Sequence, residues 1–205
     1  MRHLILTAAL ATVAALMASV GTGLAQGQDD RRLRTDLSGF EEAQNANATT
    51  GAPPIAAIFS TGNGQLTLKI DRQSREITYE LTYEFPDAAA TPIVGTQFVN
   101  QGHLHVGQKH TAGSIYVWLC QSADSPAPAA VALSTPTCPS PSGTVAGSIT
   151  PAKVLAVPAQ GFPDGEAGFD ALLAAIESDA IYGNVHTDRS PAGEIRGQVG
   201  DLPPQ

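Results

Sequence analysis

Three histidines have a spacing that could hold a transition-metal ion. His103 and His105 are separated by one residue in a stretch that is expected to form a β-strand. Alternate side chains of a strand lie on one face, so the two imidazoles are expected side by side, with Cα atoms about 7 Å apart. His186 lies near the end of another expected strand. If the two strands are neighbours, its ring completes a three-nitrogen site suited to copper or zinc.

The same histidines have a simpler explanation. A lone histidine near a strand end commonly hydrogen-bonds a backbone carbonyl, and an H-x-H pattern alone is not specific. His110 is a further candidate ligand, in the expected loop before the next strand. The two alternatives differ in whether the rings converge on one point. If they do hold a metal, binding is expected to weaken as pH falls through about 6.5, where free imidazole is protonated.

Signatures of the common enzyme classes are missing or weak in the chain. It contains no G-x-S-x-G, H-E-x-x-H or P-loop pattern. His186, Asp188 and Ser190 lie in or beside one expected turn, and nothing indicates an oxyanion hole. Glu194 and Arg196 are expected to form a surface ion pair worth less than about 1 kcal/mol. We therefore expect no enzymatic activity.

The elements that would position the histidines are mostly short strands. Residues 66–70 and 77–85 alternate apolar and polar side chains around a turn, which predicts a hairpin with one face in water. The run 114–120 is apolar on both faces, so we expect it at the centre of the sheet. Further strands are expected at 33–39, 96–106 and 143–149, and a closing hairpin at 180–187 and 194–199.

One helix is expected before the closing hairpin. Its apolar stripe comprises Phe169, Leu172, Leu173 and Ile176, at positions i, i+3, i+4 and i+7. Acidic residues such as Glu166 and Asp170 suit the positive end of the helix dipole. Many short strands with a single short helix predict an all-β fold, an antiparallel Greek-key-like sandwich or barrel.

The N-terminal residues have the features of a secretory signal peptide. Residues 4–20 are almost entirely apolar, and small residues at Gly23 and Ala25 favour cleavage before Gln26. A retained membrane anchor is the alternative, because a spanning helix needs about 20 apolar residues. After cleavage we expect a secreted or periplasmic protein without a membrane span. The expected organisation is a signal peptide at 1–25, a disordered leader at 26–32, one domain at 33–200 and a tail at 201–205.

Net charge argues against binding to nucleic acid. The chain has 11 basic and 19 acidic side chains, and removal of residues 1–25 takes away only Arg2, for a net charge of −9. Such a surface repels nucleic acids and anionic membranes. The hydrophobic share of 42% is ordinary for a folded domain.

The two cysteines, Cys120 and Cys138, are expected to form a disulfide in an oxidising compartment. Closing this loop would stabilise the fold by about 3 kcal/mol in the chain-entropy model. The enclosed segment is rich in Pro, Ser and Ala without periodicity, so the bond would restrain an otherwise flexible loop. Two free buried thiols are the alternative.

Several segments resemble one protein family. Residues 182–199 read YGNVHTDRSPAGEIRGQV and closely resemble the end of the CHRD domain, which is named for chordin. Residues 102–107 resemble its central H-x-H-x-G element, and 37–42 together with 66–83 resemble its opening strands. The resemblance spans about 33–199. Its C-terminal motif includes Asn184, Thr187, Gly193, Glu194, Arg196 and Gly197.

The resemblance implies an extracytoplasmic β-sandwich-like module and little about biochemistry. Chordin is a secreted antagonist of bone morphogenetic proteins, but this chain has no cysteine-rich chordin modules, so a stand-alone microbial-type protein is expected. Residues 121 to about 144 depart from the compact family pattern and look like an insertion.

Two functions follow as expectations. The first is a non-catalytic binding module for an unknown protein or surface partner. The alternative is a copper- or zinc-binding protein that uses the three histidines. The H-x-H also resembles the copper ligands of Cu/Zn superoxide dismutases, but that likeness is local and leaves dismutase-like chemistry a remote alternative.

Overall fold

The computed structural model describes residues 31–45, 53–86 and 98–200. The expected signal peptide, the tail and most of the expected leader lie outside these ranges. The first strand begins at Arg31, so the last two residues of the expected disordered leader, Arg31 and Arg32, belong to the sheet instead. No helix in the described part of the chain is long and apolar enough to cross a membrane.

Eight strands and one α-helix account for most of the described residues. In chain order they are β1 (Arg31–Ser38), β2 (Asn63–Asp71), β3 (Glu76–Glu84), β4 (Val99–Val106), β5 (Ser114–Cys120), β6 (Gly143–Ile149), α1 (Gly165–Glu177), β7 (Ile181–Thr187) and β8 (Ile195–Gln198). The predicted strands and the helix before the closing hairpin are therefore confirmed, with ends that move by a few residues.

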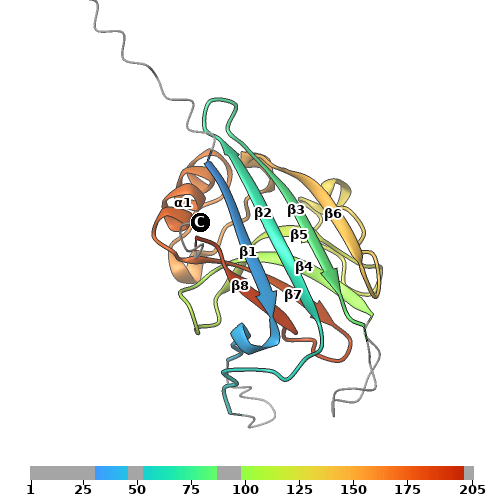
Figure 1. Cartoon of the computed structure of the whole chain (residues 1–205). Coiled ribbons are helices and arrows are strands. Elements are labelled where there is room, and N and C mark those ends of the chain that lie inside the picture. The colour runs from blue at the N-terminus through green and yellow to red at the C-terminus, as the bar shows by residue number, and fades with distance from the viewer. Residues whose placement is uncertain (1–30, 46–52, 87–97, 201–205) are drawn as a thin grey trace, which may run out of the picture.

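The strands form one antiparallel sheet that curls into a nearly closed barrel (Figure 1). Their order is β5-β4-β7-β8-β1-β2-β3-β6. The predicted all-β, antiparallel, barrel-like fold is confirmed. Side chains on the inner face form the hydrophobic core, which includes Leu66, Leu81, Leu104, Val185 and Ile195.

The β2–β3 hairpin shows the alternation that its sequence predicts. The register pairs Leu68 with Tyr79 and Leu66 with Leu81, and all four side chains are buried in the core. Between them, Thr78 and Glu80 are exposed on the other face. A sheet with one face in water explains this pattern.

Strand β5 is not where its composition predicted. It lies at one end of the strand order, not at the centre, although Tyr116, Val117 and Leu119 are fully buried. Other segments cover it: the backbone N–H of Leu155 donates to the carbonyl of Tyr116 at 3.0 Å, and the Tyr116 hydroxyl donates to the carbonyl of Pro163 at 2.8 Å. Apolar side chains on both faces of a strand therefore indicate that the strand is buried, but not that it lies at the centre of the sheet, because covered edge strands are buried too.

Helix α1 packs its apolar stripe into the core and holds its acidic side chains toward the β2–β3 turn. Phe169, Leu172 and Ile176 are buried. Arg75, in that turn, forms ion pairs with Glu166 at 2.7 Å and with Asp170 at 2.8 Å. Only Glu166 lies in the first turn of the helix.

The segment after β5 is held by a disulfide and by hydrogen bonds. Cys120 and Cys138 are bonded, as predicted. The side-chain amide of Gln121 donates to the carbonyls of Ala132 and Thr135, each at 2.7 Å, and its oxygen accepts from the N–H of Ala127 at 2.8 Å. The disulfide is therefore not the sole restraint on this segment.

Candidate metal centre

The strands that carry the three histidines are neighbours in the sheet. Strands β4 and β7 pair antiparallel, in a register that places His103 opposite Asn184 and His105 opposite Tyr182. His186 is opposite Gln101, further along the same pair. The histidines alternate with core residues such as Leu104 and Val185, so they lie on the outer face of the barrel.

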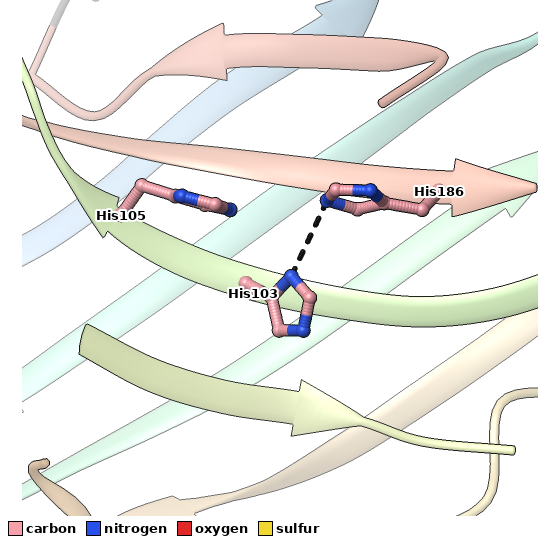
Figure 2. Close-up of side chains that lie close together, drawn as sticks. All are labelled: His103, His105 and His186. Carbon is pink, nitrogen blue, oxygen red and sulfur yellow. Dashed lines mark hydrogen bonds between the residues drawn. The ribbon is translucent and has the colours of Figure 1, made fainter. Parts of the chain in front are cut away.

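The three imidazoles converge, as Figure 2 shows. One ring nitrogen from each lies within 4.8 Å of the others. The shortest separation, 3.3 Å, is between Nδ1 of His103 and Nε2 of His186. His110 does not belong to this cluster: it is exposed in the loop between β4 and β5, with a φ of +62°.

The cluster is buried although it lies on the outer face. The exposed fractions of His103, His105 and His186 are 0%, 7% and 6%. Loops cover the rings and contribute backbone carbonyls. The oxygen of Gly113 accepts from Nδ1 of His105 and that of Pro191 from Nδ1 of His186, each at 3.0 Å.

These two hydrogen bonds determine where the ring protons are. A carbonyl can only accept, so Nδ1 of His105 and of His186 carries the proton and each Nε2 keeps a lone pair. The structural explanation of the histidines, a hydrogen bond to a backbone carbonyl, accounts for these Nδ1 atoms. It leaves the Nε2 of His105 buried without a hydrogen-bond partner, and the Nε2 of His103 likewise.

Burial keeps all three imidazoles neutral. Loss of solvation lowers the pKa of His105 to about 3 and that of His186 to about 4, and it holds the pKa of His103 well below 6.5. The proximity of His186 lowers the pKa values of His103 and His105 further. Neutral imidazole is the form that ligates metal. In the folded protein, protons should therefore compete with a metal well below the pH of about 6.5 that the free side chain suggests.

Aromatic side chains enclose two of the rings. His103 and Trp118 pack in a T-shaped pair with a centroid distance of 4.2 Å. His105 stacks on Tyr182 at 4.7 Å, with the rings nearly parallel. The guanidinium carbon of Arg196 lies 3.4 Å from the centroid of the Tyr182 ring.

The expected surface ion pair between Glu194 and Arg196 is wrong, because both side chains are buried and use other partners. Arg196 donates to the carbonyls of Thr111 at 2.7 Å and Gln108 at 2.9 Å. Both acceptors lie in the loop between β4 and β5, so Arg196 anchors this loop over the outer face.

Glu194 has a different set of partners. Its carboxylate accepts from the hydroxyl of Ser60 at 2.7 Å and from the hydroxyl of Thr187. It thereby ties the segment before β2 to the end of β7. The motif residues Thr187 and Glu194 are thus hydrogen-bonded to each other, and neither belongs to the histidine cluster.

Asn184 connects the outer face to a carboxyl group that the sequence did not single out. Its side-chain nitrogen donates to Glu42 and to the carbonyl of Ile195. Burial raises the pKa of Glu42 to about 7, although Arg196 and hydrogen bonds oppose the shift. The only signal for Glu42 in the sequence was its place in the opening segment that resembles the family.

The two motif glycines are sites of close approach. Gly193 has a φ of +126°, and a Cβ there would lie 2.7 Å from both the Asn184 side-chain nitrogen and the Glu42 carboxylate. At Gly197 a Cβ would lie 2.2 Å from the backbone oxygen of Asp36, on the paired strand β1. Both positions therefore require glycine for the contacts seen.

A pocket of about 430 Å³ lies over His105. Its lining residues are Glu42, Ala43, Gln44, Asn45, His105, Ala112, Gly113, Tyr182, Asn184 and Ala192. Asn45 and Ala192 are exposed, whereas His105 and Asn184 are buried. The pocket therefore connects the solvent with one of the three imidazoles.

Comparison with known proteins identifies the family. The family model of the CHRD domain matches residues 33–199, which is most of the chain. Neither a curated protein nor a solved structure gives a significant match. The match contains both histidine-bearing strands, and we conclude that the chain belongs to the CHRD domain family.

Proposed function

We propose that this CHRD-domain protein binds a copper or zinc ion through Nδ1 of His103, Nε2 of His105 and Nε2 of His186. The observation that carries the proposal is the convergence of three neutral, buried imidazoles, of which His105 directs into the shared space an Nε2 lone pair that has no hydrogen-bond donor. Imidazole nitrogen suits both metals. The ring nitrogens that point into the shared space in Figure 2 are the three named atoms.

Either position of the ring proton on His103 leaves buried nitrogen lone pairs without a donor, which favours a bound cation. If His103 carries its proton on Nδ1, that proton can reach His186, but Nε2 of both His103 and His105 remains an unpaired buried acceptor. If the proton is on Nε2, two lone pairs face each other across 3.3 Å. An unpaired buried acceptor costs about 1–3 kcal/mol. An ion bound to Nδ1 of His103 and to Nε2 of His105 and His186 would remove this cost at these three atoms, and the proton of His103 would then lie on its Nε2.

Distances also fit a metal ion. Nitrogens that bind zinc tetrahedrally at about 2.0–2.1 Å are about 3.3 Å from one another. The pair formed by His103 and His186 already has this separation, 3.3 Å. Since the whole group lies within 4.8 Å, a small movement of His105 would complete the set.

The surroundings of the rings resemble the outer shell of a metal site. Metal-ligating histidines usually donate their other N–H to a carbonyl or carboxylate, which fixes the tautomer and the ring orientation. His105 and His186 do so to the carbonyls of Gly113 and Pro191. Both rings are therefore oriented before an ion binds, which lowers the cost of binding.

Titration of the metal-free protein tests the proposal. We expect tight 1:1 binding of Cu(II) or Zn(II) in isothermal calorimetry. Replacing any one of the three histidines by Ala should lower affinity at least about 100-fold, because even an outer-shell change costs 10- to 100-fold. His110→Ala is the matched control and should change little. If the wild type binds no tighter than the triple alanine variant, the histidines are structural.

A partner-binding role has separate support and forms the second candidate. Ile55 and Phe59 are exposed, at 40% and 59%, and both line an apolar pocket of about 440 Å³. A single exposed apolar residue is ordinary, but two beside an apolar pocket favour a contact with a protein or surface. Phe59→Glu should abolish retention of such a partner, whereas Phe98→Glu, at another exposed phenylalanine, should not. Equal retention by both variants would contradict this role.

We also propose that the protein works outside the cytoplasm and without catalysis. The apolar N-terminal segment and the disulfide between Cys120 and Cys138 support export. Intact mass of the exported protein should show a chain that begins near Gln26. A chain that still carries residues 1–25 would instead indicate an anchor.

A further inference from the structure

Two acceptor atoms in the buried floor of the pocket over His105 have no hydrogen-bond donor. Besides His105 Nε2, the side-chain oxygen of Asn184 is buried there without a partner. The orientation of this amide is determined by its nitrogen, which donates to Glu42 and to the Ile195 carbonyl. Asn184 is 2% exposed. Two buried acceptors of one pocket therefore call for a ligand that supplies hydrogens or positive charge.

The pocket offers little to an anion. Among its lining residues, Glu42 has the only acidic side chain and there is no Lys or Arg. Arg196, the nearby cation, directs its guanidinium to the carbonyls of Thr111 and Gln108. The hydroxyl of Tyr182 accepts from the N–H of Gly113 at 3.0 Å and keeps its own O–H as a neutral donor. A negatively charged ligand would meet no Lys or Arg side chain in this lining and two unpaired acceptors at its floor.

With an ion on the three histidines, the lone pair of His105 is used and the Asn184 oxygen remains. We propose that the pocket admits a small uncharged amine or hydroxyl compound to the open position of the ion. Its nitrogen or oxygen would bind the ion, and its N–H or O–H would donate to Asn184. This inference rests on the proposed metal site and adds the class of ligand that the site takes.

The test uses the Cu(II)-loaded protein, or the Co(II)-loaded protein if only zinc binds. Methylamine, at a pH near 9 and counted as free base, is titrated against azide while the metal absorption spectrum is recorded. We expect methylamine to perturb the spectrum at a concentration at least about 10-fold lower than azide. Asn184→Leu should remove most of this preference. Equal or tighter binding of azide would overturn the proposal.

A second variant tests the route and does not depend on the fold of the Asn184 variant. Ala192→Trp fills the exposed rim of the pocket and should weaken the methylamine response at least about 10-fold. Ala152→Trp, at an exposed position outside the pocket, is the matched control and should respond like the wild type. An unchanged response in Ala192→Trp would show that ligands do not enter here, and the proposal would fall.

Failure of the proposed metal site can be distinguished from failure of the pocket proposal. Metal affinity is measured first for each variant, and Ala192→Trp should retain the wild-type value because residue 192 is exposed and is not one of the three proposed ligands. If the wild type fails to bind copper or zinc, the proposed function fails before any ligand is added, and the pocket proposal with it. If metal binds but neither probe changes the spectrum, only the pocket proposal fails.

Discussion

The two halves of the barrel treat their outer faces differently. In the β2–β3 hairpin, buried core residues alternate with exposed ones such as Thr78 and Glu80. In β7 and β8 every residue is buried, including Asn184, His186 and Arg196 on the outer face. The outer face of this second half lies under the loops that follow β4 and β7, which supply the carbonyls of Gln108, Thr111, Gly113 and Pro191.

This difference determines whether a polar side chain needs a hydrogen-bond partner within the protein. Thr78 and Glu80 can hydrogen-bond to water, so a protein partner is not required there. Under the loops a polar atom must find a protein partner or remain unpaired at a cost of about 1–3 kcal/mol. Most do find one, as Arg196 does. Of the four buried side-chain atoms in the described residues that have no hydrogen-bond partner, three belong to His103, His105 and Asn184, at or beside the candidate metal centre.

Arg196→Met should produce the largest effect, because it removes the anchor of the loop between β4 and β5. The carbonyls of Thr111 and Gln108 would lose a charged donor, and Tyr182 would lose the guanidinium over its ring. We expect a loss of about 3–5 kcal/mol in the free energy of unfolding, because each hydrogen bond to a charged group contributes about 1.5–3 kcal/mol and two are lost. Urea unfolding measures it. A loss below about 1 kcal/mol would mean that the loop does not depend on Arg196.

Acidification should destabilise the metal-free protein through the covered histidines. Their folded pKa values lie below 6.5, at about 3 for His105 and about 4 for His186. As pH falls from 6.5 toward 4, the unfolded chain gains protons that the folded chain does not, so the free energy of unfolding falls. Each such histidine contributes up to about 1.4 kcal/mol per pH unit in this window. Urea titrations from pH 7 to 4.5 with a chelator measure the slope.

Glu42 changes the free energy of unfolding with pH in the opposite direction to the histidines. It therefore provides a control for the pH dependence measured above. Its pKa rises from 4.5 to about 7 on folding, so its stabilising contribution is present at low pH and is lost as pH rises through 7. Glu42→Gln should therefore steepen the acid loss by about 1 kcal/mol per pH unit. A shallower slope in this variant would contradict the assigned burial of Glu42.

Gly193→Ala should cost about 2–3 kcal/mol. Its backbone conformation is strained for alanine, and the new Cβ would meet Asn184 and Glu42 at 2.7 Å. Gly161→Ala is the matched control: its φ is also positive, at +77°, but a Cβ there meets nothing within 4 Å. The left-handed conformation alone costs about 1–2 kcal/mol, so Gly161→Ala should be the milder change in thermal unfolding. Equal losses would show that the contact at Gly193 contributes nothing.

Thr78→Ala should have the smallest effect. Its side chain is exposed on the open face of β3, where the substitution changes strand propensity and the cross-strand contacts with Lys69 and Ser148. We expect a change within about 0.5 kcal/mol in urea unfolding. A loss comparable to that of Arg196→Met would erase the proposed difference between the two halves.

Local patterns in the sequence were sufficient for most elements. The alternation in 66–70 and 77–85 and the stripe of α1 each depend on side chains a few residues apart, and both predictions are confirmed. The place of β5 and the surroundings of Glu194 and Arg196 were predicted wrongly. In these cases the deciding neighbours are distant in the chain, such as Leu155 for β5 and Gln108 for Arg196.

The features of the candidate site also separate into those predicted from local sequence and those that depend on residues distant in the chain. The sequence by itself placed His103 and His105 on one face, because the period of a β-strand is a local property. Only the tertiary structure brought His186 beside them, through the pairing of β4 with β7, and left His110 in the solvent. It also buried the rings under two loops, which sets their tautomers and lowers their pKa values. Desolvation depends on everything that covers a group, and the residues that cover this one are separated from it along the chain.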